Sequence, residues 1–283
     1  MNNIPDKPYP ELRSVLERFV ADVQNALKRN FVGAYLVGSL ATGDFDLDSD
    51  IDFLIITDDE LSDVELRSLQ EMHVQIHGLG CYPAEHLEGS YISRDSLNQL
   101  DLVGVQQLWY VDNGSTSLER SVHDNQWHVR WILRERAIIL LGPDPRVLMQ
   151  PVPAEALRAE MVAAIQKLTT HFAAEIGKPL GYFNTRFGQS FTVLTCCRML
   201  HTLQSGVVNS KLSAVQWTEQ SLNPVWHELI HQAWTERDGV RFCEKIRQPA
   251  EAKLLQQTAH FLAYAQEECS VHHPKLGSQN LIS

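Results

Sequence analysis

The sequence predicts two domains of different fold class: an α/β domain with a mixed sheet flanked by helices, and an all-α helical bundle after it. In the first half, short apolar strands alternate with amphipathic helices, whereas in the second half the strand signals vanish. Two proline-rich stretches, 142–145 and 151–153, separate the halves. We therefore expect an α/β domain over residues 1–148, a helical domain over 149–273 and a loose tail over 274–283.

The first domain begins with an amphipathic helix. Residues 9–29 carry one apolar stripe at helical spacing, formed by Leu12, Val15, Leu16, Phe19, Val20, Val23 and Leu27. Three strands are expected after it, over 31–37, 51–56 and 86–93, with a surface helix over 58–72. Between the predicted strand over 86–93 and Leu141, strand and helix signals are mixed.

The second domain is expected to contain only helices. Their predicted ranges are 154–176, 188–204, 210–220, 224–236 and 240–268. Asn223-Pro224 supports the start of the fourth helix, because a capping asparagine precedes a proline in the first turn.

The composition is normal for a soluble globular protein and limits the expected partners. The 283 residues include 44% hydrophobic and 21% charged side chains, and the formal net charge is -11. No charged-then-apolar leader and no apolar stretch of roughly twenty residues is present, which predicts a protein that stays in the cytoplasm. Five cysteines, an odd number, fit that reducing compartment.

The acidic balance bears on what the protein binds. A protein that grips a nucleic-acid backbone normally carries a basic patch, and no Lys/Arg cluster occurs here. An acidic surface suits a small cationic acceptor, although solubility alone also explains it. We expect a monomer with no nucleic-acid and no membrane partner.

The most informative feature is Gly38-Ser39 followed by Asp50-Ile51-Asp52. An apolar run ends in Gly-Ser, and two alternating carboxylates stand at the head of the next apolar run. Side chains two apart on a strand share a face, so Asp50 and Asp52 point together and favour a hard cation such as Mg²⁺ between them. Gly38 permits a close approach of the backbone to a phosphate, and Ser39 adds a hydroxyl and an N–H donor. This layout predicts a nucleotidyl-transfer site.

Nucleotidyl transfer also needs a carboxylate that activates the attacking hydroxyl. Glu88 is the best candidate, because it is an acid inside an otherwise apolar strand. The alternative is a solvated charge on an edge strand.

A second motif points to different chemistry. His227-Glu228-Leu229-Ile230-His231 matches the H-E-x-x-H zinc pattern on a predicted helix, which would place both imidazoles on one face. The extended pattern fails, because Trp234 stands where a glycine would follow. A zinc hydrolase that uses His227, Glu228 and His231 is an alternative function, and ordinary helical histidines are the simpler reading.

These residues suggest a family. The Gly38-Ser39 and Asp50-Ile51-Asp52 signature resembles that of the DNA polymerase β-like nucleotidyltransferase superfamily. The second half is similar to the helical domain of bacterial aminoglycoside adenylyltransferases of the streptomycin/spectinomycin type. Four stretches carry this second likeness: Leu141-Gly-Pro143, Pro151-Val-Pro153, Val193-Leu-Thr-Cys-Cys-Arg198 and Gly206-Val-Val-Asn-Ser-Lys211.

The resemblance implies a role for each matching residue. Asp50 and Asp52 would be magnesium ligands, and Glu88 falls where the family keeps its catalytic base. Nucleotide contacts are implied at Gly38, Ser39, Ser49, Arg198, Lys211 and Trp234. Mg²⁺ is then the cofactor and ATP a substrate, which we expect in a cleft between the two domains.

The chain departs from the family pattern in the stretch 182–190, which lacks the tryptophan and the acidic residues that hold streptomycin in its modifying enzymes. The sequence thus predicts transfer of AMP from ATP to a hydroxyl of a small aminoglycoside-like acceptor, with spectinomycin favoured over streptomycin. A protein or another metabolite as the acceptor of the same chemistry is the alternative.

Overall fold

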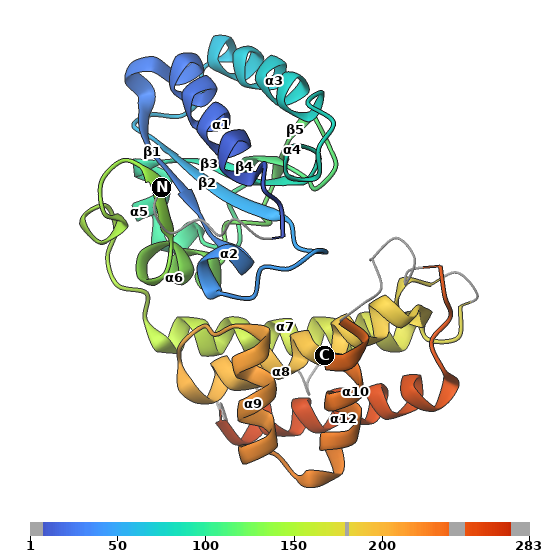
Figure 1. The fold of residues 1–283 in the computed structure, drawn as a ribbon. Helices are drawn as coiled ribbons and strands as arrows, with labels where there is room; N and C mark the ends of the chain where they lie inside the picture. The colour runs from blue at the N-terminus through green and yellow to red at the C-terminus, as the bar shows by residue number, and fades with distance from the viewer. Residues whose placement is uncertain (1–7, 179–180, 238–246, 273–283) are drawn as a thin grey trace. The chain divides into compact units, whose positions relative to one another are not determined.

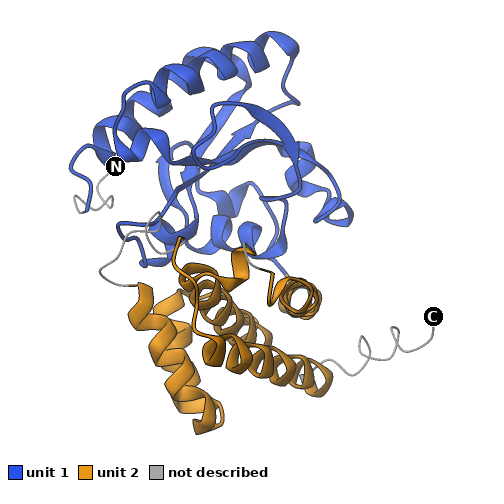
Figure 2. Cartoon of the chain, turned by 90° about the vertical axis from the view of Figure 1, so that its right-hand side faces the viewer, with its two compact units in different colours: residues 1–152 blue, residues 153–283 orange. Residues whose placement is uncertain are grey.

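The computed structural model describes residues 8–178, 181–237 and 247–272. The chain divides into two compact units, Met1–Val152 (unit 1) and Pro153–Ser283 (unit 2), coloured separately in Figure 2. The tail expected from residue 274 lies outside the described residues. In the described part of the chain, no helix is long and apolar enough to cross a membrane.

Unit 1 is built on one six-stranded mixed sheet with the strand order β5-β4-β3-β2-β1-β6 (Figure 1). Its strands are β1 (Phe31–Leu36), β2 (Ile51–Thr57), β3 (Leu87–Ser93), β4 (Leu108–Val111), β5 (Leu118–Ser121) and β6 (Ile138–Leu141). Only β2 and β3 pair in parallel; the other four pairings are antiparallel. The parallel pair requires a crossover, which α3 supplies.

Two longer helices cover one face of this sheet (Figure 1). They are α1 (Leu12–Leu27) and α3 (Asp63–His77), with the short α4 (Tyr82–Glu85) beside them. All seven apolar residues of the predicted α1 stripe are buried, so that prediction is confirmed. The helices α2 (Gly38–Thr42), α5 (Arg94–Asn98) and α6 (Trp127–Glu135) complete unit 1 together with three short 3-10 turns.

The start of α3 differs from the prediction. The expected helix began at residue 58, but α3 begins at Asp63 because Ser62 forms a capping box with Glu65. The Ser62 hydroxyl accepts the Glu65 N–H, and the Glu65 carboxylate accepts the Ser62 N–H at 2.8 Å. The capping chemistry, rather than the apolar pattern, sets the boundary.

The regular elements of unit 2 within its described residues are all helices, as predicted. Its helices are α7 (Ala154–Glu175), α8 (Arg186–Ser205), α9 (Lys211–Ser221), α10 (His227–Arg237) and α12 (Ala252–His272). The central helix is α8, which packs against the other four and buries an apolar run from Val193 to Leu203. The last helix was predicted over 240–268, of which residues 240–246 lie outside the described part of the chain. Pro249 forms a bridge with Thr185, and α12 begins after it, at Ala252.

Candidate active site

The pairing of three strands brings the two sequence motifs and Glu88 to one edge of the sheet. Antiparallel β1 and β2 pair Leu36 with Phe53, so the end of β1 that carries Gly38 lies beside the start of β2 that carries Asp52. In the parallel β2–β3 pair, Asp52 is the direct partner of Glu88. Strand alternation then puts both side chains on the face opposite α1 and α3.

Gly38 lies so close to Asp52 that a side chain at position 38 would overlap the Asp52 carboxyl group. Its φ is +54°, and a Cβ built on it would lie 1.7 Å from Asp52 Oδ2. The backbone closes the same contact, since Val37 N–H donates to the Asp52 carbonyl at 2.9 Å and Ser39 N–H donates to the Asp52 carboxyl. The Gly-Ser turn is thus fastened directly to the second aspartate of the motif.

The two serines of the motif differ in what their hydroxyls do. Ser39 Oγ is buried and has no hydrogen-bond partner among the described residues. Ser49 is buried too, but its hydroxyl donates to Asp46 Oδ1 at 2.7 Å and accepts from Asp46 N–H at 3.0 Å. The Ser39 hydroxyl therefore suits a ligand with acceptor oxygens, such as a phosphate, whereas Ser49 braces the loop.

Four carboxylates gather at this edge: Asp50, Asp52, Glu88 and Asp124. Burial, together with the negative charges of Glu88 and Asp50, raises the pKa of Asp52 from 3.8 to about 8. A cation placed among these groups would remove that repulsion. The donor set fits a hard divalent ion such as Mg²⁺, which takes oxygen ligands.

Glu88 is buried on β3, an interior strand, so the solvated edge-strand reading is wrong. Tyr110 Oη donates to Glu88 Oε1 at 2.6 Å, and His123 Nε2 lies 3.2 Å from the same oxygen. Burial alone raises the pKa of Glu88, but the hydrogen bonds from His123 and Tyr110 outweigh it and hold the pKa below its usual value. Glu88 is thus ionised at neutral pH, as a general base must be.

Two family models match the chain. The nucleotidyltransferase domain matches residues 20–88, which contain Gly38-Ser39, Asp50-Ile51-Asp52 and Glu88. The aminoglycoside adenylyltransferase C-terminal domain matches residues 147–264. Both matches support the predicted likeness to the aminoglycoside adenylyltransferase family. The two matched models and the observed architecture confirm the predicted fold class and the predicted enzyme class, a nucleotidyltransferase.

Curated relatives and a solved structure agree with this family. The chain is 23% identical over 214 residues to a spectinomycin 9-adenylyltransferase from Campylobacter jejuni, covering 73% of this chain and 78% of the relative. It is 23% identical over 223 residues to a Staphylococcus aureus enzyme of the same name, covering 76% and 77%. The crystal structure of spectinomycin adenyltransferase AAD(9) from Enterococcus faecialis with ATP and spectinomycin matches with a TM-score of 0.64 at 16% identity, over 90% of this chain and 99% of that one.

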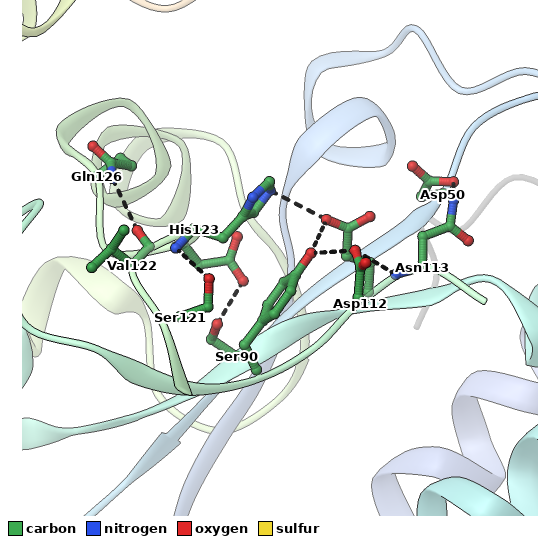
Figure 3. A network of polar contacts seen from close by, with 11 residues as sticks. Asp50, Ser90, Asp112, Asn113, Ser121, Val122, His123 and Gln126 are labelled. Atoms are coloured by element: carbon green, nitrogen blue, oxygen red, sulfur yellow. Dashed lines mark hydrogen bonds and ion pairs between the residues drawn. The ribbon is translucent and has the colours of Figure 1, made fainter. Parts of the chain in front are cut away.

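Sequence reasoning missed several residues that surround the carboxylates of the site. Asn113, in the turn after β4, donates from Nδ2 to Asp50 Oδ1 (Figure 3). Its Oδ1 accepts a hydrogen bond from His86 Nδ1–H at 2.6 Å. Ser90 Oγ donates to Asp124 Oδ2 at 2.7 Å. Asn113 and Asp124 come from the stretch before Leu141 where strand and helix signals are mixed, whereas Ser90 lies in the predicted third strand and no motif marks its hydroxyl.

The nucleotide contacts implied for the second half belong to unit 2. Arg198 lies on α8, Lys211 is the first residue of α9, and Trp234 lies on α10 against the apolar core of unit 2. Lys211 Nζ is 5.6 Å from the centre of the Phe191 ring. Their contacts with a nucleotide stay a prediction.

The H-E-x-x-H motif occupies the start of α10, as the sequence predicted, with His227 and His231 one turn apart. Within residues 8–178, 181–237 and 247–272, no group of three or more His, Cys, Asp or Glu side chains is arranged to hold a metal ion. Neither the two histidines nor Asp50 and Asp52 therefore belong to such a group of three. A metal at Asp50 and Asp52 would take its remaining ligands from a nucleotide and from water, as Mg²⁺ commonly does.

Proposed function

We propose that this protein transfers AMP from ATP to a hydroxyl of spectinomycin or a closely similar small acceptor, in a Mg²⁺-dependent reaction. The observation that carries the chemistry is the buried Glu88 in register beside Asp52, next to the Gly38-Ser39 turn. The acceptor is proposed from the relatives, which are named for spectinomycin. The stretch 182–190, without acidic residues, supports spectinomycin over the more cationic streptomycin.

Asp50 and Asp52 would hold the metal. When bound there, Mg²⁺ neutralises charge that develops on the phosphates and on the departing pyrophosphate. Asn113 fixes the Asp50 carboxylate from one side, and the Ser39 N–H fixes that of Asp52. The Ser39 hydroxyl would donate to a phosphate oxygen of ATP. Arg198, Lys211 and Trp234 are proposed as the nucleotide contacts of unit 2.

Glu88 would act as the general base. Its carboxylate accepts the proton of the acceptor hydroxyl, the hydroxyl oxygen forms a bond to the α-phosphorus of ATP, and the bond from that phosphorus to pyrophosphate breaks. The products are the adenylylated acceptor, pyrophosphate and a protonated Glu88. General-base catalysis of this kind contributes about 10² to 10⁴ in rate.

Calorimetry and a pyrophosphate-release assay test this function. Wild-type protein should bind ATP only with Mg²⁺, and should release pyrophosphate when spectinomycin is added. Asp50→Asn should abolish both, whereas Asp22→Asn, a matched change on α1 away from the site, should preserve both. Absence of Mg²⁺-dependent ATP binding would overturn the nucleotidyltransferase site. ATP binding without a response to spectinomycin would move the acceptor to streptomycin, a protein or another metabolite.

We also propose that the enzyme is a cytoplasmic monomer. Cys81, Cys196, Cys197 and Cys269 are free thiols, which fits a reducing compartment where ATP is abundant. Sedimentation of the purified protein tests the monomer, since a dimer would double its mass.

A further inference from the structure

We propose that Tyr110 and His123 are positioning residues that hold the Glu88 carboxylate by its Oε1 atom and so aim Oε2 at the acceptor hydroxyl. This inference rests on the proposed function, in which Glu88 is the general base. It concerns two residues that lie outside every sequence motif, one on strand β4 and one in the loop after β5.

The sheet itself directs Tyr110 toward Glu88. Strand β4 pairs with β3 so that Tyr110 is the direct partner of Ser90, two residues beyond Glu88. The side chains of Glu88, Ser90 and Tyr110 share one face, and a long tyrosine spans such a diagonal. The tyrosine is buried, and its hydroxyl donates to Glu88 Oε1 at 2.6 Å. It also lies 2.9 Å from Asp112 Oδ1, so its single hydrogen is shared between two carboxylates.

His123 approaches the same oxygen from a different element. Its Nε2 is 3.2 Å from Glu88 Oε1, and its ring stacks on the Tyr110 ring with centroids 5.1 Å apart and 26° between the planes. The imidazole points into the network from the loop, while Asp112 lies in the turn after β4 and Asn113 turns toward Asp50 (Figure 3). The hydrogen bond to Glu88 raises the pKa of His123 from 6.5 to about 9, so the ring is a cation at neutral pH.

Hydrogen bonds of Asn125 anchor the loop that carries His123. Asn125 is fully buried, and its Nδ2 donates to the carbonyls of Leu102 and Gln106 at 2.9 Å each. Arg130 of α6, also buried, donates to Asn125 Oδ1 at 2.9 Å. These bonds anchor the backbone two residues after His123, so the fold places the imidazole beside Glu88 although the His123 side chain is 58% exposed.

Two hydrogen-bond donors on one carboxylate oxygen fix the orientation of the Glu88 side chain. A glutamate has three side-chain torsions, and a base misplaced by about 1 Å can cost about 10²-fold in rate. Tyr110 and His123 both bind Oε1, and Glu88 also forms a side-chain hydrogen bond with Asp50; with Oε1 occupied by two donors, we assign Oε2 to the acceptor hydroxyl. Removing either donor frees the carboxylate to rotate, whereas binding of ATP, which does not require Glu88 in the proposed function, stays the same.

The kinetic test compares single variants. Tyr110→Phe removes one hydroxyl and should lower kcat for pyrophosphate release by about 10- to 100-fold with KM for ATP unchanged. Tyr35→Phe is the matched control, because the Tyr35 hydroxyl donates at 2.8 Å to the Pro143 carbonyl and not to Glu88. His123→Leu should lower kcat similarly, and His123→Gln, which keeps an N–H donor, should recover most of it. Full kcat in Tyr110→Phe and His123→Leu would overturn the proposal.

Double variants separate positioning from a general loss of structure. In a Glu88→Gln background, Tyr110→Phe should reduce kcat no further, because the tyrosine acts only through Glu88. An equal loss in both backgrounds would assign Tyr110 another role and overturn the proposal.

An NMR titration, which needs no turnover, tests the His123–Glu88 contact separately from the proposed function. In ¹⁵N NMR, the imidazole of His123 should titrate at a higher pH in the wild-type protein than in Glu88→Gln, where its midpoint should fall toward about 6.5. Identical midpoints would show that the His123–Glu88 contact is absent and would overturn the proposal. A shifted midpoint in a protein that releases no pyrophosphate would uphold the contact and reject the proposed function alone.

Discussion

At the scale of single residues, one contact explains why the site begins with glycine. The sequence suggested that Gly38 permits a close approach to phosphate, and the structure adds that it closely approaches Asp52. The left-handed φ and the missing Cβ both matter here, because the Gly-Ser turn sits against the carboxyl that would hold the metal. A side chain at this position would push Asp52 aside or lift Ser39 away from it.

Gly38→Ala should therefore lower kcat/KM by about 10²-fold or more, since a shift of about 1 Å in a reacting or ligating group costs that much. Gly43→Ala is a matched control: its φ of +88° is equally left-handed, but a Cβ there meets nothing within 4 Å. Backbone strain alone would affect both variants alike. Steady-state kinetics of the two proteins decide the matter, and equal losses would refute the role of the Gly38–Asp52 contact.

At the scale of elements, the sequence predicted the helices and strands that apolar spacing along the chain determines. The stripe of α1, the strands β1 to β3 and the helices of unit 2 follow from apolar spacing, and Glu88 stood out as an acid in an apolar strand. The strands β4 and β5 are four residues each and depend on pairing with β3, which no local pattern encodes. Tyr110 and His123 were missed for that reason, because their meaning comes from contacts across 22 or more residues of sequence.

The packing of α3 on the sheet contains a buried histidine with a predictable effect on stability. His73 is 3% exposed among Phe19, Phe53 and Tyr91, and its Nε2 lies 2.8 Å from Tyr91 Oη. Burial lowers the pKa of His73 from 6.5 to about 4. The unfolded chain thus binds the proton more readily, so this contribution to stability is complete above about pH 6.5 and is lost as the pH falls toward 4.

Between pH 7 and pH 5, the wild-type protein should lose about 2 kcal/mol more unfolding free energy than His73→Gln, which cannot titrate but keeps a partner for Tyr91. Urea unfolding of both proteins at the two pH values measures the difference, and comparison with the variant cancels the contributions of the other histidines. The same pH dependence in both proteins would mean that His73 is protonated in the folded state.

At the scale of the whole molecule, the two units bring different chemistry to one proposed reaction. Unit 1 gathers four carboxylates at its site, Asp50, Asp52, Glu88 and Asp124. Unit 2 holds the two cations that the family resemblance assigns to the phosphates, Arg198 and Lys211. If both units contact ATP, then nucleotide affinity depends on residues far in sequence from the metal ligands.

Lys211→Met should therefore raise KM for ATP by about tenfold, the loss expected when a charge-assisted hydrogen bond of about 1.5 kcal/mol is removed, while kcat changes less. Arg198→Met should act in the same direction. Lys167→Met, on α7 of the same unit, is the matched control and should leave KM for ATP unchanged. The metal site is intact in all three proteins, so a change confined to Lys211 and Arg198 would tie unit 2 to the nucleotide. Unchanged KM values in both variants would mean that Lys211 and Arg198 do not contribute to ATP binding and would contradict their predicted role as nucleotide contacts.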